Sequence, residues 1–426
     1  MFLGLNTMDS LHDDLFIIPI DNGNIIYSPR RRGVFWADDE AAADVERYIE
    51  GESLNDSSPV HSYLERLKGV KIKPIESKDF NDGSDIVVIL SQRCNLACSY
   101  CYAQESRSHE VLDINLLKFA ILEALNNTSK QHVYLTFIGG GEPLIEWDSI
   151  KGAILFAEEN KGTKNIFYSI TTNLTLLNND ILDFAKKYNV KFGVSFEILK
   201  DIQDKQRPFH VANKSSFDIV HKNIIELIKR GLSYNIRSTI TDLNVSRMPE
   251  MVRFVGENYP GLRKVHFEQV TDPETNGPAF YNEFINYFMI ARETGRKYNI
   301  NVYNSISNSI YNIKDRFCRG EFCITPTGSI VACHRLSSKR DINYDLFHIG
   351  DIVEDKGVIF SGQKIKEYLR FSNEKRSLCN NCFAIYHCAG ICPMERSCLT
   401  ERQIESKCDF TRSLIKRLLT EFVNNQ

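Results

Sequence analysis

SQRCNLACSYCYAQES, residues 91–106, follows an apolar, β-branched run, DIVVIL at 85–90, that predicts a buried strand. The stretch carries Cys94, Cys98 and Cys101, with three and then two residues between them. A structural zinc site closes with four ligands, usually as two CxxC pairs, whereas residues 102–317 contain no further cysteine. A cubane of four irons and four sulfides can be held by three thiolates, with one iron left open for a small-molecule ligand. The spacing therefore favours a catalytic iron–sulfur site.

Length and composition set the class of protein. The 426 residues exceed what one hydrophobic core normally supports, so two or three domains are expected. The net charge of −3 argues against broad binding to nucleic acid or an anionic membrane, and the basic run PRRR at 29–32 is expected to be a solvated turn. The N-terminus lacks a basic leader followed by an apolar stretch, and no long apolar run follows, so we expect a cytoplasmic protein without signal peptide or membrane span.

The other cysteines form a second group. Of the twelve cysteines, nine lie between residues 318 and 408. Neither scattered buried cysteines nor a disulfide scaffold would leave such a gap, and disulfides are rare in the cytoplasm. Two separate metal-binding regions are therefore predicted.

Between the two groups, strand-like and helix-like segments alternate. Asn178 and Ser215 or Ser216 are the expected N-caps, and Gly231 is an expected C-cap. Six βα units in a row predict an α/β fold with a parallel sheet and right-handed crossovers, open as a partial (β/α)6 TIM-like barrel. The predicted strands are 85–90, 132–138, 165–172, 190–197, 235–241 and 264–270, and the predicted helices are 113–126, 147–159, 178–188, 215–230, 248–257 and 279–298.

Several polar motifs follow these strands. The three-cysteine loop follows the first strand, GGGEPL at 139–144 the second and TTNL at 171–174 the third, and Ser195 lies near the end of the fourth. Because the carboxyl ends of parallel strands meet at one rim of a barrel, we expect these features to form one site.

Two further domains flank the barrel, which is expected over 81–310. Residues 1–80 read as a small α+β domain, with strands near 16–20 and 24–27 and a helix through 37–51. Residues 311–426 have few long periodic runs and read as a loop-rich domain organised by metal.

CNLACSYC at 94–101 resembles the CxxxCxxC signature of radical S-adenosylmethionine (SAM) enzymes, in which an aromatic residue, here Tyr100, commonly precedes the third cysteine. The resemblance implies that the three cysteines hold a 4Fe-4S cluster whose open iron binds the amino and carboxylate groups of SAM. One electron from the reduced cluster then cleaves SAM to methionine and a 5′-deoxyadenosyl radical, which abstracts hydrogen from a substrate. Tyr100 and Tyr102 are expected at this cofactor site.

Further motifs extend the resemblance. Gly140, Gly141, Glu142 and Pro143 are similar to the family's GGEP, whose backbone and Glu bind the SAM ammonium; an isolated GGGEP would be a glycine turn. TTNL is similar to the family's TTNG, with Asn173 kept and the glycine replaced by leucine.

Ser195 and Arg207 resemble the Ser and Arg that contact SAM in peptide- and protein-modifying members, and their separation of twelve matches. The chain reads Ser-Phe-Glu-Ile at 195–198 where the family usually has SxDG. An Arg that clamps a carboxylate is chemically reasonable, and a surface charge at a helix start is the alternative.

The C-terminal cysteines resemble the SPASM domain, which houses auxiliary iron–sulfur clusters; a zinc ribbon is the alternative. The resemblance implies two further 4Fe-4S clusters, one on Cys379, Cys382, Cys388 and Cys408, and one on Cys318, Cys333 and Cys392 with Cys323 as the candidate fourth ligand. Three clusters then need eleven of the twelve cysteines. Cys398 is favoured as the spare one, although Cys323 could be spare if the cluster keeps an open iron.

The resemblance implies an enzyme that modifies peptides. An auxiliary cluster can receive the second electron after hydrogen abstraction, so we expect an oxidative cross-link, thioether or carbon–carbon, in a ribosomally made precursor peptide, with flavodoxin or ferredoxin as reductant. Residues 24–51 resemble small leader-binding domains, in which a strand edge could pair with a leader peptide; an inert cap is the alternative.

Two rival functions remain. An anaerobic sulfatase-maturating enzyme usually carries an Asp where this chain has His334, a residue expected beside the cluster rather than as a base. A non-catalytic iron–sulfur electron carrier would need neither an open iron nor GGGEP.

Overall fold

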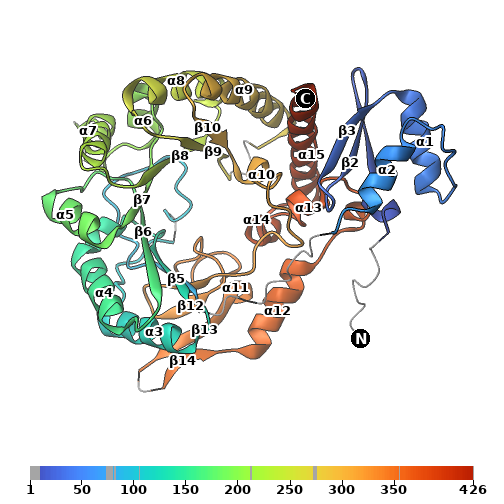
Figure 1. Cartoon of the computed structure of the whole chain (residues 1–426). Helices are drawn as coiled ribbons and strands as arrows, with labels where there is room; N and C mark the ends of the chain where they lie inside the picture. The colour runs from blue at the N-terminus through green and yellow to red at the C-terminus, as the bar shows by residue number, and fades with distance from the viewer. Residues whose placement is uncertain are drawn as a thin grey trace.

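The chain folds around one long sheet whose centre is a parallel partial barrel (Figure 1). The computed structural model describes residues 10–72, 80, 83–104, 106–211, 214–271, 276–354 and 356–425. The six predicted barrel strands are present, run parallel and neighbour one another in chain order. They are β4 (Asp85–Val88), β5 (His132–Phe137), β6 (Asn165–Thr172), β7 (Lys191–Ser195), β8 (Tyr234–Ile240) and β9 (Lys264–Gln269).

An outer arc of helices covers the barrel strands (Figure 1). Asn178 and Ser215 are N-caps, because their side chains accept from the amides of Ile181 and Asp218. Gly231 has φ 64° directly after the C-cap residue of its helix, as the sequence predicts. The helices are α3 (Ile114–Asn127), α4 (Trp147–Asn160), α5 (Asn179–Tyr188), α7 (Ser216–Lys229), α8 (Met248–Asn258) and α9 (Pro278–Lys297), together with the unpredicted α6 (Lys200–Gln206).

Side chains of the barrel strands alternate between two environments. Val194 and Ile236 are fully buried in the main core, whereas the adjacent Ser195 is half-buried and Arg237 is exposed. Successive strand residues point to opposite faces, and the helices cover the apolar face. Ser195 and Arg237 therefore lie on the inner face of the barrel.

The sheet continues past the predicted barrel on both sides. β10 (Asn301–Tyr303) pairs in parallel with β9, and β11 (Phe322–Ile324) pairs in parallel with β4. β11 begins an antiparallel meander through β12 (Ser329–Val331), β13 (His348–Val353) and β14 (Gly357–Phe360). The cysteine-rich region is thus fused to the barrel beside the strand that leads into the three-cysteine loop. The sequence gives little signal for these strands because most are only three or four residues long.

The prediction that few long periodic segments follow residue 311 is wrong for two helices. α12 (Gly362–Asn373) and α15 (Glu401–Asn424) are regular, and α15 packs on α9, where the Tyr281 and Phe410 rings stack at 4.5 Å. An apolar stripe on α15 provides this packing face. The other helices of this region and its approach are short: α10 (Ser305–Asn308), α11 (Tyr344–Phe347), α13 (Ile385–Cys388) and α14 (Pro393–Cys398).

The N-terminal unit is a three-stranded antiparallel sheet with two helices. β1 (Phe16–Ile20), β2 (Gly23–Ser28) and β3 (Gly33–Ala37) precede α1 (Asp39–Ile49) and α2 (His61–Lys68), so the sequence missed β3 and α2. Ile26 packs with these helices, whereas Ile25 and Tyr27 on the opposite face belong to the main core. The Tyr27 hydroxyl lies 2.7 Å from His387 Nε2 in α13, so this unit contacts the cysteine-rich region directly.

The basic run at 29–32 is not simply a solvated turn. The Arg31 side chain is 4% exposed and its Nη1 lies 3.2 Å from Asp14 Oδ2. Asp14 also accepts from the Ser28 hydroxyl and from the amides of Arg30 and Arg31. The buried Asp14 carboxylate therefore holds Arg31 toward the interior. The sequence did not indicate this ion pair, because the two residues are 17 positions apart.

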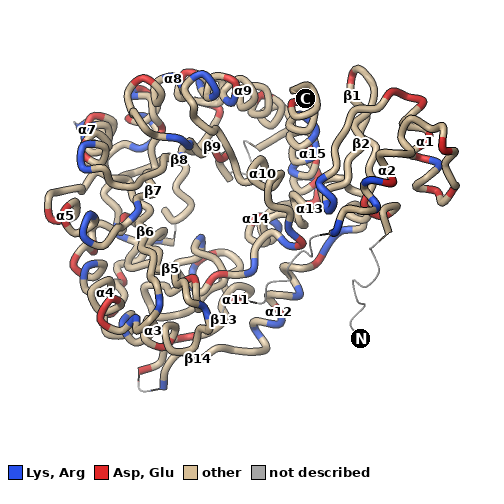
Figure 2. Tube along the Cα trace, viewed as in Figure 1, with Lys and Arg blue, Asp and Glu red and all other residues tan. Residues whose placement is uncertain are grey.

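Charged residues of both signs are interspersed along the outer helices (Figure 2). Among the helices of the described ranges, none combines the length and the apolar character that a membrane crossing requires. Residues 1–9, on which part of the signal-peptide expectation depends, lie outside the described residues, as do 73–79 and 81–82 around the predicted domain boundary.

Candidate active site

The three-cysteine loop leaves the end of β4 and is held by the segment that follows α6. The Ala97 amide donates to the Pro208 carbonyl at 2.8 Å, and the Ser99 amide donates to the Gln206 carbonyl at 2.9 Å. Leu96 and Phe209 form an isolated antiparallel bridge. These bonds hold the loop across the carboxyl ends of the strands.

The three thiols of this loop lie in one another's electrostatic field. Burial raises the pKa of Cys94 to about 11, and Glu142 and Cys98 nearby add to the rise. Burial also raises the pKa of Cys98, with Cys101 contributing. Iron bound to these sulfurs would stabilise the thiolates that burial disfavours, so this donor set fits a cluster.

Arg107 provides a positive charge at the loop that the sequence gave no reason to select. Its Nη2 donates to Cys101 Sγ at 3.7 Å, and its Nη1 lies 3.4 Å from His210 Nε2. A cation in this position opposes the negative charge of the thiolates.

The glycines of GGGEP permit a close approach to the three-cysteine loop. A Cβ on Gly141 would lie 2.0 Å from the Arg93 carbonyl oxygen, and a Cβ on Gly140 would lie 2.8 Å from that of Ser91. The Glu142 amide donates to the same Arg93 carbonyl at 2.8 Å. The glycine turn and the functional interpretation are therefore compatible, because the turn brings Glu142 against the loop.

Glu142 is a buried, oriented carboxylate. It accepts from Thr172 Oγ1 at 2.6 Å, from the Asn173 amide at 2.7 Å and from the Leu144 amide at 3.1 Å. Burial raises the pKa of Glu142, while these hydrogen bonds oppose the rise. Pro143 begins the short 3-10 helix Pro143–Glu146 that leads into α4. A carboxylate at this position suits a bound ammonium group.

Asn173 lies beside the loop, because its Nδ2 donates to Asn95 Oδ1 at 2.9 Å. Two of the family's glycines are replaced here, and both replacements keep a left-handed backbone: Leu174 has φ 60° and Ile198 has φ 68°. This conformation costs a non-glycine residue about 1–2 kcal/mol. Both side chains are fully buried, and this burial offsets the strain.

Glu197 joins four groups around the site and was missed by the sequence reasoning. One carboxylate oxygen accepts from the Tyr100 hydroxyl and lies 3.6 Å from Arg207 Nη1; the other accepts from Ser238 Oγ at 2.5 Å and from the Thr239 amide at 2.9 Å. Glu197 is fully buried, and burial raises its pKa while Arg207 opposes the rise. The only signal in the sequence is that Glu197 stands where the family's SxDG pattern has its aspartate.

Arg207 is not a surface charge at a helix start. It is 9% exposed, is the C-cap residue of α6, and donates to the Tyr100 hydroxyl at 2.7 Å. The fold therefore brings Arg207 to the three-cysteine loop. Ser195 ends β7 on the inner face, beside rather than within this cluster.

Four of the C-terminal cysteines line one cavity. Cys379, Cys382, Cys388 and Cys408 face it together with Arg412, although Cys408 lies on α15 and the others precede it. Burial raises the pKa of Cys408 to about 12, and Cys388 and Cys379 add to the rise. The structure thus brings together the four residues that the sequence grouped.

The second predicted group also converges. Burial raises the pKa of Cys333, with contributions from Glu321, Cys392 and Cys318. Burial likewise raises the pKa of Cys323, with Glu321 and Cys333 contributing. Cys398, the favoured spare residue, is exposed and its sulfur contacts only Asn343 and Ser397 among the hydrogen-bonding groups of the described chain.

Tyr102 and His334 both approach the glycine turn after β5, where a Cβ on Gly139 would lie 3.3 Å from the Tyr102 hydroxyl and 3.1 Å from the His334 carbonyl oxygen. The Arg335 guanidinium lies 5.6 Å from the centre of the Tyr102 ring. His334 Nδ1 lies 2.8 Å from Glu321 Oε1, and its amide donates to Glu321 Oε2 at 2.6 Å. His334 is thus paired with a carboxylate beside Cys333.

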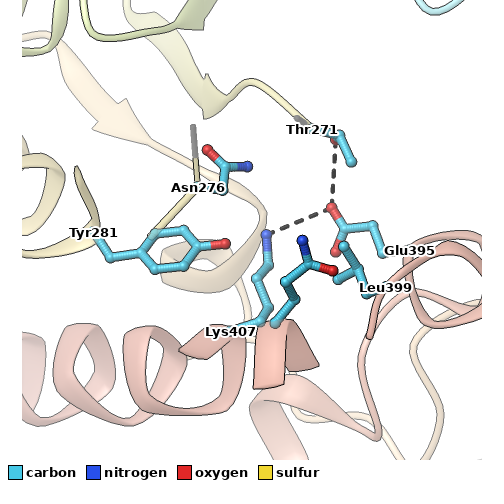
Figure 3. Close-up of a pocket in the computed structure, with 7 residues that line it drawn as sticks. Thr271, Asn276, Tyr281, Glu395, Leu399 and Lys407 are labelled. Atoms are coloured by element: carbon cyan, nitrogen blue, oxygen red, sulfur yellow. Dashed lines mark hydrogen bonds and ion pairs between the residues drawn. The ribbon is translucent and has the colours of Figure 1, made fainter. Parts of the chain in front are cut away.

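A polar pocket lies where the end of β9 meets the C-terminal helices (Figure 3). Lys407 Nζ and Thr271 Oγ1 each lie 3.5 Å from Glu395 Oε1. Lys407 precedes Cys408, and Glu395 lies three residues after Cys392. The Lys407–Glu395 pair therefore links the two cysteine-bearing segments, a connection that the sequence did not reveal.

Comparison with known proteins identifies the barrel. Residues 88–255 match the family model described as the radical SAM superfamily. The chain carries a radical SAM domain. The prediction of a radical SAM enzyme is confirmed, and this family implies one 4Fe-4S cluster and SAM.

Two curated relatives cover most of the chain. It is 28% identical over 320 residues to the cysteine-type anaerobic sulfatase-maturating enzyme of Clostridium novyi, covering 68% of this chain and 83% of that one. It is 24% identical over 404 residues to the radical SAM cyclopropyl synthase TigE of Paramaledivibacter caminithermalis, covering 86% and 79%.

Two solved structures share the fold. Native anSMEcpe with bound AdoMet has a TM-score of 0.66 at 18% identity, covering 80% of this chain and 99% of that one. SuiB of Streptococcus suis bound to the precursor peptide SuiA has a TM-score of 0.51 at 14% identity, covering 89% and 94%. The predicted partial barrel with a C-terminal SPASM region is confirmed as the fold.

Proposed function

We propose that this protein is a radical SAM maturase that oxidatively cross-links a ribosomally made precursor peptide. The observation that carries the proposal is the convergence of Cys379, Cys382, Cys388 and Cys408 on one cavity, in a chain that also has a three-cysteine loop on its barrel. A second cluster provides an acceptor for the electron that an oxidation must remove after hydrogen abstraction. The similarity to TigE over 86% of this chain and the fold shared with peptide-bound SuiB support a peptide substrate.

Each residue of the site has a role in this proposal. Cys94, Cys98 and Cys101 hold the cluster, and the buried Glu142 binds the ammonium of SAM. Bound SAM supplies, on one-electron reduction, a carbon radical that takes a hydrogen atom from the substrate. Glu197 holds Tyr100 and Arg207 in place, so the position of Arg207 relative to the three-cysteine loop stays fixed during the reaction.

The C-terminal region receives the second electron. Cys318, Cys323, Cys333 and Cys392 hold one auxiliary cluster, and Cys379, Cys382, Cys388 and Cys408 hold the other. The substrate loses one hydrogen atom to the SAM-derived radical and then one electron and one proton, so the product has lost two hydrogens. A flavodoxin or ferredoxin supplies the electron that starts the reaction.

The N-terminal unit binds the leader of the precursor peptide. Within the described residues, β1 and β3 are the outer strands of the three-stranded sheet. Because α15 contacts β3, β1 is the edge to which an extended peptide can add by β-augmentation. The contact between Tyr27 and His387 connects this unit to the cysteine-rich region.

The test is co-expression with a candidate precursor peptide, taken from any small open reading frame found beside the gene, followed by tandem mass spectrometry of the peptide. Loss of two hydrogens with a new cross-link supports the proposal. The anaerobically reconstituted protein should form 5′-deoxyadenosine on reduction and contain about twelve irons per chain, four for each of three cubanes. Iron near four would defeat the auxiliary-cluster assignment.

Sulfatase maturation is the second candidate, because the Clostridium novyi relative matches over 83% of its length. A synthetic sulfatase-type peptide with a target Cys or Ser separates the two. Formylglycine in that peptide, without change in the neighbouring small peptide, would select this function.

A further inference from the structure

Arg107 follows the three-cysteine loop in sequence, and the backbone around it is held against the start of that loop. The Ser108 amide donates to Gln92 Oε1 at 2.7 Å, and Gln92 is fully buried. Ser91 and Val111 form an isolated antiparallel bridge. These contacts fold the segment after the loop back onto the segment before it, so the place of Arg107 beside the cysteines is set by the fold.

The half-buried Arg107 guanidinium is held from the side of His210. Nη1 lies 3.4 Å from His210 Nε2, and the His210 amide donates to the Asn95 carbonyl at 3.4 Å. Nη2 donates to Cys101 Sγ at 3.7 Å. The guanidinium is therefore fixed between His210 and the third cysteine of the loop.

One N–H group of this guanidinium is buried and unused. Arg107 Nε has no hydrogen-bond partner among the described residues. In any guanidinium, Nε–H and the Nη2 group lie on one edge of a rigid plane, so the unused N–H is directed to the side on which Cys101 lies. A buried donor without an acceptor is unfavourable. The sulfur atoms of an iron–sulfur cluster accept hydrogen bonds, so a cluster on the three cysteines would give this N–H an acceptor.

The charge of Arg107 acts on the thiols and is not cancelled by a carboxylate of the described chain. Burial raises the pKa of Cys94 and of Cys98, and the Arg107 charge opposes both rises. Across the described residues, Arg107 makes no ion pair. Arg207, by contrast, has Glu197 Oε1 at 3.6 Å from its Nη1. Arg107 is therefore the cation whose charge remains available to the metal site.

We propose that Arg107 donates hydrogen bonds to the SAM-binding cluster and raises its reduction potential, through Nη2 to the Cys101 thiolate and through Nε to a second sulfur of the cluster. Reduction adds one electron, so the reduced cluster carries one more negative charge than the oxidised cluster. A cation that donates two N–H groups stabilises the more negative form more strongly, and hydrogen bonds to the sulfurs are among the features that set the potential of such clusters. The electron that starts the reaction then enters the cluster more readily.

The test is a potentiometric titration of the anaerobically reconstituted full chain, followed by electron paramagnetic resonance. Wild type, Arg107→Gln and Arg107→Lys are compared. The SAM-binding cluster is distinguished from the others because SAM binds its open iron and changes its spectrum. At a fixed potential, Arg107→Gln should lower the ratio of reduced to oxidised cluster about tenfold, a fall of about 59 mV in the midpoint potential of a one-electron couple. Arg107→Lys keeps the charge but not the planar fork, so its midpoint should lie between the other two.

Arg253→Gln is the matched control, because it removes the same charge from an exposed residue of the outer helix α8. Its midpoint potential should equal that of wild type. If Arg107→Gln has the same midpoint as Arg253→Gln, the inference is wrong. An equal shift of the auxiliary clusters in Arg107→Gln would also contradict it, because a direct donor acts on the cluster that it touches.

Iron content separates this role from a structural one. Arg107 is not an iron ligand, so Arg107→Gln and Arg107→Lys should bind as much iron per chain as wild type. Loss of about four irons from both variants would show that Arg107 is needed to assemble the loop, and would overturn the proposed effect on the potential.

This inference depends on the radical SAM cluster and not on the peptide substrate, so it and the proposed function fail separately. An unmodified precursor peptide would defeat the cross-linking function and leave the measured potentials as they are. An unchanged midpoint in Arg107→Gln would defeat the role of Arg107 and leave the cross-linking function intact.

Discussion

Glu197→Gln tests whether a single buried carboxylate holds the site together. The substitution keeps the shape of the side chain and removes its charge. Glutamine has one oxygen and one NH₂ group in place of the two carboxylate oxygens. Whichever way the amide turns, its NH₂ group faces another donor, either the Thr239 amide or the Arg207 guanidinium. Arg207, itself 9% exposed, keeps the Tyr100 hydroxyl but loses its charged partner.

The expected loss follows from these contacts. Removing one partner of a buried ion pair typically costs about 3–5 kcal/mol, because the other charge stays buried without compensation. We expect the urea midpoint of the barrel to fall accordingly. SAM binding should weaken too, because Arg207 loses its charged partner and the Tyr100 hydroxyl no longer donates to a carboxylate. Tryptophan fluorescence reports the unfolding, since Trp147 begins α4 of the barrel.

Glu250→Gln is the matched control. Glu250 accepts from Arg247 Nη2 at 2.9 Å, but its side chain is 46% exposed, and exposed pairs contribute about 0–1 kcal/mol. If Glu197→Gln unfolds at the same urea concentration as Glu250→Gln and binds SAM as wild type does, the role of Glu197 as the carboxylate that holds Tyr100 and Arg207 is wrong.

Three further changes probe the site. Gly141→Ala places a Cβ 2.0 Å from the Arg93 carbonyl oxygen, so it should lower the iron content by about four per chain and stop SAM cleavage. In the control Gly277→Ala the Cβ meets nothing within 4 Å, so neither property should change. Equal iron content in both variants would contradict the close-approach argument. Cys408→Ala should reduce iron and Cys398→Ala should not, and the opposite pattern would reassign the spare cysteine. Leu174→Gly should lower stability in urea unfolding, because losing a buried leucine costs about 3 kcal/mol or more against about 1 kcal/mol of relieved left-handed strain; a more stable variant would refute this balance.

The regular parts of the fold were predictable from local pattern. The strands β4–β9 and the six predicted helices agree with the predicted ranges within about two residues, because each carries an apolar period that local sequence determines. The strands β10–β14 were not predicted, since pairing with neighbouring strands places them: β10 with β9, β11 with β4, and the other three in the meander that starts at β11.

The candidate site divides in the same way. The cysteines, GGGEP and Asn173 were selected from residue type and spacing, because their chemistry is carried by the side chains themselves. Glu197 and Arg107 were not selected from the sequence, because the role of a glutamate or an arginine depends on the residues that it contacts in the fold.

The sequence by itself determined the chemistry available to this protein: three cysteines at a strand end, a second set of nine, and glycines that allow a close turn. Only the tertiary structure decided which of the polar groups are already engaged and which remain free. Arg207, selected from sequence, is held by Tyr100 and Glu197. By contrast, the guanidinium of Arg237, which the sequence did not distinguish, makes no hydrogen bond within the described chain. The reason is physical, since hydrogen bonding and burial depend on residues distant in sequence that only the fold brings together.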